Sequence, residues 1–156
     1  MEQIRSVAAE SWANAYAGII PPETQNRALA AWYDTEAIKS AMAEDGAVFL
    51  VALAHGVVVG FIHLGPPQAG TVELLRMYVL PRNARQGVGT RLLEAGVSAY
   101  ESHDAQISVA VAERNSSGRA FYEKSGFVLT GTRTVDVFGA SIAEVTYIRN
   151  LEGGAA

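Results

Sequence analysis

The chain has 156 residues, of which 49% are hydrophobic and 18% charged, and this predicts a single domain spanning residues 1–156 with a sizeable core. It contains no cysteine, which excludes disulfides, thiolate metal sites and a cysteine nucleophile. The net charge of −4 and the lack of a membrane-length apolar run predict a cytoplasmic protein that binds neither nucleic acid nor membrane.

The N-terminal part has the apolar spacing of three short helices. Apolar residues recur on one side of each helix over 4–15, 28–32 and 38–42, and Asp34 or Thr35 can cap the third helix. The segment from Trp12 to Ile20, with Tyr16 in its middle, is apolar and loop-like, so it is a candidate pocket wall. The alternative is that its aromatic residues are ordinary core anchors.

From residue 48 onward, apolar and β-branched runs predict strands. The runs 48–53 and 57–64 flank a short turn with Gly56 and predict an antiparallel hairpin. The run 72–80 is apolar on both faces, as in a central strand covered by helices. Together with the helix that follows it and the strand 106–112, it forms a right-handed crossover between parallel strands. Two final strands are expected over 128–137 and 141–148, and the tail 153–156 is expected to be frayed.

A short basic loop with two glycines, Gly87 and Gly89, joins the strand 72–80 to the next helix. Glycines leave backbone N–H groups uncovered at a helix start, where the helix dipole favours an anion. A Walker loop is excluded because Thr90-Arg91 follows Gly89, and a dinucleotide fingerprint is excluded because Leu92 stands at its third glycine. On this segment alone, a glycine-rich turn without a ligand remains the alternative.

A second motif covers residues 115–127. Asn115 or Ser116 can cap a short helix, Lys124 lies in its last turn, and Gly126 followed by Phe127 is the expected helix stop.

Together, the glycine loop and the segment with Asn115 and Phe121-Tyr122-Glu123-Lys124-Ser125-Gly126-Phe127 resemble the GNAT superfamily of acetyl-coenzyme A dependent N-acetyltransferases. The resemblance covers residues 48–148. It implies an α/β (α+β) fold with a mixed, mostly antiparallel sheet, helices on both faces and a splayed parallel strand pair at the cofactor site. Residues 11–21 also resemble the N-terminal region of a polyamine acetyltransferase subgroup. The family's usual strand before the first helix has no counterpart, so we expect a shorter sheet edge.

The resemblance implies that acetyl-coenzyme A is the acetyl donor. Backbone N–H groups of the loop would hold the pyrophosphate, side chains of Arg82, Arg85 and Arg91 would add positive charge, and the strand before the loop would bind the pantetheine arm. Ala84 stands where the family usually has Gln or Arg, and Gly118 replaces a usual Ala. The implied cofactor-binding residues are Met77, Tyr78, Val79, Ala84, Arg85, Gln86, Gly87, Val88, Gly89, Thr90 and Asn115.

The resemblance also implies two catalytic residues. Tyr122 stands at the family's position for the acid that protonates the leaving thiolate, with a packing tyrosine as the alternative. Glu73 stands at the position of the base that takes the amine proton, and we expect it to face the same way as Leu75 and Met77. Its alternative is a solvated carboxylate at a strand end.

We therefore expect an acyltransferase that acetylates the primary amine of a small molecule by direct attack in a ternary complex. The expected acceptor-binding residues are Trp12, Tyr16 and Ile19, with Trp32, Tyr33 and Phe138 as further candidates. A polyamine fits the acidic balance, and an aminoglycoside, an amino acid or a protein N-terminus are the alternatives. The alternative functions are a non-catalytic acyl-coenzyme A binding module with the same fold, and a nucleotide-binding enzyme. Family habit favours a homodimer. We expect no metal, because His55, His63 and His103 lack ligand spacing.

Overall fold

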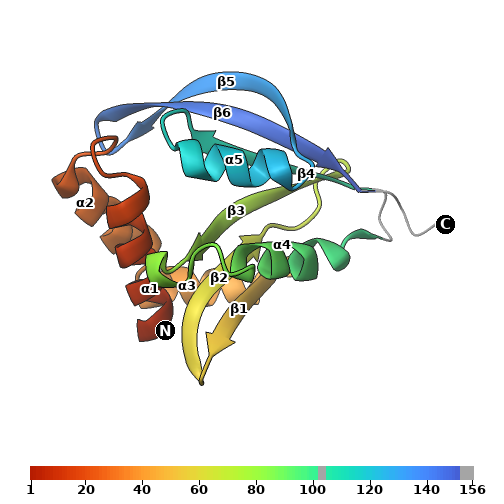
Figure 1. The fold of residues 1–156 in the computed structure, drawn as a ribbon, viewed down its shortest axis with the longest axis horizontal. Coiled ribbons are helices and arrows are strands. Elements are labelled where there is room, and N and C mark those ends of the chain that lie inside the picture. The colour runs from red at the N-terminus through yellow and green to blue at the C-terminus, as the bar shows by residue number, and fades with distance from the viewer. Residues whose placement is uncertain (102–104, 152–156) are drawn as a thin grey trace.

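The computed structural model describes residues 1–101 and 105–151, so His103 and the tail 153–156 lie outside the described residues. Its strands are β1 (Val48–Ala54), β2 (Val57–Leu64), β3 (Thr71–Val79), β4 (Gln106–Ala112), β5 (Val128–Val137) and β6 (Ala140–Asn150). They form one sheet in the order β1-β2-β3-β4-β6-β5 (Figure 1). Only β3 and β4 are parallel; the other neighbours are antiparallel. The predicted mixed, mostly antiparallel sheet is thereby confirmed.

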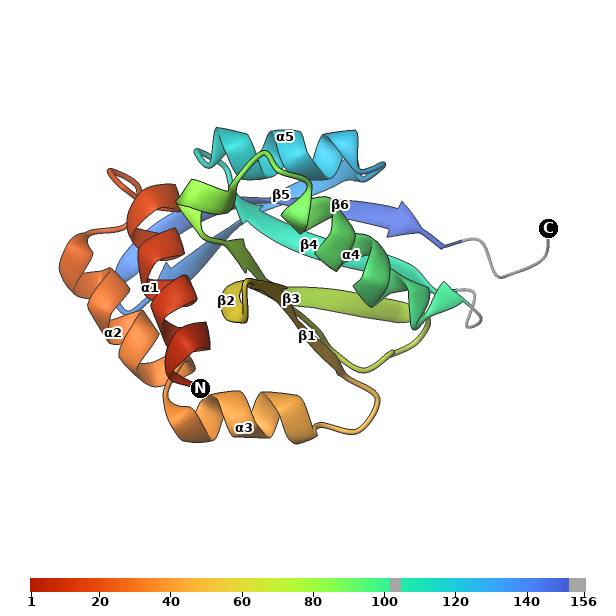
Figure 2. The same ribbon diagram turned by 60° about the horizontal axis from the view of Figure 1, so that its bottom comes forward.

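Helices cover both faces of the sheet, as predicted (Figure 2). They are α1 (Glu2–Ala15), α2 (Pro22–Trp32), α3 (Thr35–Ala43), α4 (Val88–Ser98) and α5 (Ser116–Lys124), and a 3-10 turn, η1 (Pro81–Asn83), precedes α4. Apolar residues of α4 and α5 pack on one face, and those of α1, α2 and α3 on the other. Asp34 caps α3, accepting a hydrogen bond from the Ala37 N–H at 2.7 Å. Within the described residues, no helix combines the length and apolar character needed to cross a membrane.

The parallel strands β3 and β4 pair only at their beginnings. Thr71, Val72 and Glu73 lie opposite residues 106–108, and no pairing continues beyond them. The two strands then move apart toward the end of the sheet where α1 lies (Figure 1). The main-chain groups that β3 would offer to β4 beyond Glu73 are therefore free of a sheet partner, and the expected splay is confirmed.

A bulge in β3 corrects the predicted direction of Glu73. Leu64 pairs with Leu74 and His63 with Arg76, which leaves Leu75 as an extra residue. One extra residue reverses the alternation of side chains, so Met77 returns to the α4 face that also holds Val72 and Leu74. The prediction that Glu73 shares a face with Met77 is therefore wrong. Leu75 is 45% exposed, so β3 is also not covered by helices on both faces along its whole length.

The last hairpin is tighter than predicted. β6 begins at Ala140, and only Phe138 and Gly139 connect it to β5. Both residues have positive φ, 47° and 90°, as a two-residue hairpin turn of the right twist requires.

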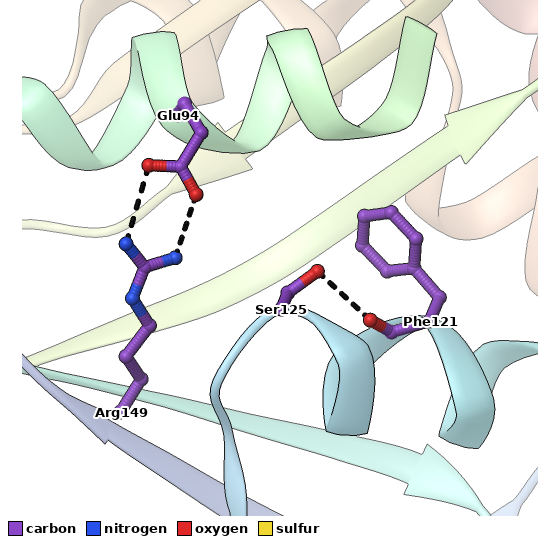
Figure 3. Close-up of polar contacts among 4 residues, drawn as sticks. All are labelled: Glu94, Phe121, Ser125 and Arg149. Carbon is purple, nitrogen blue, oxygen red and sulfur yellow. Dashed lines mark hydrogen bonds and ion pairs between the residues drawn. The ribbon is translucent and has the colours of Figure 1, made fainter. Parts of the chain in front are cut away.

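Strand β6 holds both helices that border the opening of the sheet. The Tyr147 hydroxyl is fully buried, donates to a Glu123 carboxylate oxygen of α5 at 2.8 Å and accepts from Nε of Arg119 at 3.1 Å. Two residues along β6, Arg149 donates two hydrogen bonds to Glu94 of α4 at 2.8 and 3.2 Å (Figure 3). One strand thus fixes the positions of α4 and α5 relative to each other.

We predict that Tyr147→Phe lowers the free energy of unfolding by about 1–3 kcal/mol, because it removes a fully buried hydroxyl and its hydrogen bonds to the charged side chains of Glu123 and Arg119. Arg149→Gln is the matched comparison. It should cost less than about 1 kcal/mol, because its partner Glu94 is 49% exposed. Urea unfolding of both variants measures the difference, and equal losses would contradict this ranking.

Candidate active site

The loop between β3 and α4 presents a helix start without a side-chain cap. Gly87 is the N-cap residue of α4 with a φ of 81°, and no side chain caps the first turn. A residue with a Cβ is strained at this φ, so glycine is required here. The free N–H groups of the first turn and the helix dipole together favour a bound anion.

A cavity of about 800 Å³ opens between this loop, the diverging strands β3 and β4, and helix α5. Gln86 and Val88 do not line it, and Arg82, outside it as well, forms an ion pair with Glu10 at 3.0 Å. The cavity brings together the two sequence motifs that lie apart in the chain. The predicted site residues in its lining are Tyr16, Met77, Tyr78, Val79, Ala84, Arg85, Gly87, Gly89, Thr90, Asn115 and Tyr122.

The first cavity is also lined by residues of α5 for which the sequence predicted no binding role. Ser117, Phe121 and Lys124 follow one another at helical spacing on a single face of α5. This spacing, read from the Asn115 cap, is the signal that could have identified them. Phe121 lies against the start of α4, where a Cβ on Gly89 would come within 3.2 Å of its ring. Gly89 therefore permits the close approach of the two helices.

Asn115 caps α5. Its side-chain oxygen accepts from the Gly118 N–H at 3.1 Å and lies 3.4 Å from the Ser117 hydroxyl. A Cβ at Gly118 would lie 2.6 Å from the Asn115 amide nitrogen, so the glycine makes room for the cap. The departure from the usual alanine thus has a packing reason.

Tyr122 lines the first cavity and is only 7% exposed. Its ring packs edge-on against Phe121 and Phe127 at centroid distances of 5.2 and 5.3 Å. Burial, with a smaller effect of Tyr16, raises its pKa above the ordinary value of 10.0, so the hydroxyl is protonated at neutral pH. Tyr122 is therefore a packed side chain with a protonated hydroxyl in the lining of the cavity, and its role as the acid stays a prediction.

A second cavity of about 470 Å³ lies on the other side of β3, among α1, α2 and the last hairpin. Trp12 and Tyr16 line it, as do Trp32 and Tyr33. The predicted Ile19 does not, and its neighbour Ile20 takes that place. Trp12 is at the same time a core anchor, 5% exposed, so the two interpretations of these aromatic residues hold together. Phe138 lies behind the wall, with its ring 5.6 Å from that of Trp32.

The two cavities share a wall. The hydroxyls of Tyr16 and Tyr78 lie 3.1 Å apart there, and burial raises the pKa of both tyrosines, so they are uncharged. The second cavity therefore adjoins the first beside these two uncharged hydroxyls. The residues in both linings are Tyr16, Leu75, Arg76, Tyr78 and Ala110.

Glu73 lines neither cavity. It is exposed and lies in the paired part of β3, where its carbonyl accepts from the Gly65 N–H at 2.9 Å. The acidic residues in the lining of the second cavity are Asp136 and Glu144, both from the last hairpin. Sequence reasoning missed them because only the order of the strands brings this hairpin beside β4. The role of Glu73 as a base stays a prediction.

Arg76 was also missed, although it lines both cavities. It donates to Nδ1 of His63 at 3.1 Å and to the Trp32 carbonyl at 3.0 Å, and it lies over the Tyr33 ring at 5.0 Å. Burial, reinforced by this positive charge, lowers the pKa of His63 to about 4. His63 is therefore neutral at pH 7. Separately, the described part of the chain contains no group of three or more His, Cys, Asp or Glu that could hold a metal ion.

Residues 7–127 match the model of the Acetyltransferase (GNAT) family, so the chain belongs to this family and is an N-acetyltransferase. The match confirms the resemblance drawn from the two motifs.

Named relatives agree with this assignment. A spermidine N(1)-acetyltransferase of Thermoplasma acidophilum is 32% identical over 137 residues, which cover 85% of this chain and 84% of that protein. The crystal structure of the PaiA N-acetyltransferase from the same organism, in complex with coenzyme A, has a TM-score of 0.80 at 28% identity, covering 96% of this chain and 91% of that one. A GCN5-related N-acetyltransferase from Rhodopseudomonas palustris shares the fold, with a TM-score of 0.76 at 24% identity over 94% of this chain and 87% of that one.

We predict that His63 makes stability fall as the pH is lowered from 6.5 to about 4. The folded pKa lies below that of the unfolded chain, so the unfolded state takes up the proton first and gains up to about 3 kcal/mol. His63→Gln, which keeps an acceptor for Arg76, should flatten this part of the curve in urea unfolding. His55→Gln, at an exposed turn, is the control, and an unchanged curve for His63→Gln would contradict the assignment.

Proposed function

We propose that this acetyltransferase transfers the acetyl group of acetyl-coenzyme A directly to the primary amine of a small molecule, with both substrates bound at once. The observation that carries the proposal is that the two cavities adjoin each other and have five lining residues in common. A donor in one cavity and an acceptor in the other would lie close together, so transfer would need no covalent enzyme intermediate.

The residues of the first cavity fit the donor. The uncapped start of α4 offers backbone N–H groups to a pyrophosphate, and Arg85 and Lys124 line the same cavity. Ala84 contributes no polar side chain, so the backbone amides would carry most of the binding. The unpaired edge of β3 at Met77, Tyr78 and Val79 suits an extended amide-containing arm, which would add to it as a strand does.

The thioester would supply an activated acetyl group. Side chains at the junction of the cavities would donate and accept the protons. The amine nitrogen first adds to the acetyl carbon and gives a tetrahedral oxyanion, which then collapses as the bond from carbon to sulfur breaks. Tyr122 donates its hydroxyl proton to the sulfur and regains a proton that the amine releases through water. A backbone N–H of the unpaired part of β3 can stabilise the oxyanion between the two steps.

A non-catalytic acyl-coenzyme A binding module with this fold is the alternative. The retained Tyr122 and the second cavity favour catalysis, because a module that only binds the donor needs neither.

We further propose that residues 1–156 act as one catalytic domain, in the cytoplasm and as a homodimer. Size-exclusion chromatography with light scattering tests the oligomeric state.

Acetyl-coenzyme A should bind the free protein, and thiol release in a screen of small amines should reveal transfer. Gly87→Ala should weaken donor binding by about tenfold, because the φ of 81° strains any other residue and displaces the amides of the first turn. Ala84→Gly is the control and should change affinity little. Calorimetry measures both. No binding at high micromolar concentration would refute the donor, and binding without transfer to any amine would favour the binding module.

Tyr122→Phe should lower kcat by about 10²–10⁴-fold while donor affinity is retained, because the packed ring remains and only the acidic hydroxyl is lost. Steady-state kinetics with calorimetry separate the two quantities. Unchanged turnover would show that Tyr122 has a packing role alone.

A further inference from the structure

Some charged side chains of the second cavity form ion pairs with each other, and others do not. Arg133 and Glu144 lie opposite each other on β5 and β6, and Nε of Arg133 donates to the Glu144 carboxylate at 2.9 Å. This pair neutralises itself. Asp136 also borders the cavity, but strand alternation turns it to the face opposite Arg133, and its carboxylate accepts from the Gly139 N–H at 3.3 Å.

Arg76 is the charged side chain of this cavity that takes no part in these ion pairs. Within residues 1–101 and 105–151, no carboxylate lies at ion-pair distance from it; its partners are the neutral His63, the Trp32 carbonyl and the face of Tyr33. A guanidinium has five N–H donors, of which these contacts use two. Its remaining donors are held in a fixed place beside the junction of the two cavities.

A half-buried cation at this place discriminates between acceptors. A carboxylate on the acceptor would receive charge-assisted, fork-shaped hydrogen bonds from Arg76. A second ammonium group would meet a like charge at the junction, and the carboxylate of Glu144 in the same cavity is already paired with Arg133.

We propose that the acceptor of this enzyme is an amine that also carries a carboxylate, and that Arg76 binds this carboxylate beside the reacting amine. The inference rests on the proposed function of the two cavities. It sets the acceptor apart from a polyamine, whose groups are all cationic.

Three probes of equal chain length test the charge preference: γ-aminobutyrate, butylamine and putrescine, which end in an anion, a methyl group and a cation. For the wild-type enzyme, kcat/KM should fall in that order, by about tenfold from the first to the last, as expected for one charge-assisted contact. Equal values, or a preference for putrescine, would overturn the proposal.

Arg76→Gln should remove the preference, and Arg76→Lys, which keeps the charge, should retain its order. Arg5→Gln is the matched control, because it removes the same group from an exposed site on α1 and should leave the order unchanged. Thermal unfolding and the affinity for acetyl-coenzyme A show whether each variant is folded. An unchanged order in a folded Arg76→Gln variant would refute the role of this residue.

Binding of the three probes to the enzyme saturated with coenzyme A separates this inference from the proposed function. If no probe is acetylated but γ-aminobutyrate still binds most tightly, transfer to such amines fails while the charge preference stands. If all three are acetylated and putrescine binds most tightly, the proposed function stands while the acceptor class is refuted.

Discussion

The early end of pairing between β3 and β4 is the constraint on which the rest of the site depends. After Glu73 the two strands no longer exchange hydrogen bonds, and main-chain groups in a protein interior need another partner. The opening receives the uncapped start of α4 on one side and Tyr122 of α5 on the other. One local loss of sheet pairing therefore makes room for an extended ligand beside both the start of α4 and Tyr122.

An opening of this kind has to be held by its borders. Tyr147 and Arg149 on β6 hold α5 and α4 through Glu123 and Glu94. On the other face, α1 reaches β3 through the Ser11 hydroxyl, which donates to the Val79 carbonyl at 3.3 Å. Apolar clusters on both faces complete the support, so the cavity walls consist of rigid elements and not of loops alone.

The sequence-based predictions hold where the signal is local and fail where the pairing of strands decides. The caps at Asp34 and Asn115, the glycine at the start of α4 and the strand limits of β2 and β4 depend on a few neighbouring residues, and the structure agrees with them. The prediction that Glu73 and Met77 share a face was wrong because the extra residue between them reverses the alternation of side chains. No residue type in the strand indicates this bulge.

By itself, the sequence determined the family, the two motifs and the helix and strand order, because capping, periodicity and glycine placement act over short distances. The tertiary structure alone decided which side chains surround the second cavity. Arg76, Arg133 and Glu144 come from three strands whose proximity follows from the sheet order, and whether each charge is paired depends on register. The uncovered charge of Arg76 is thus a property of packing, with no signal in the local sequence.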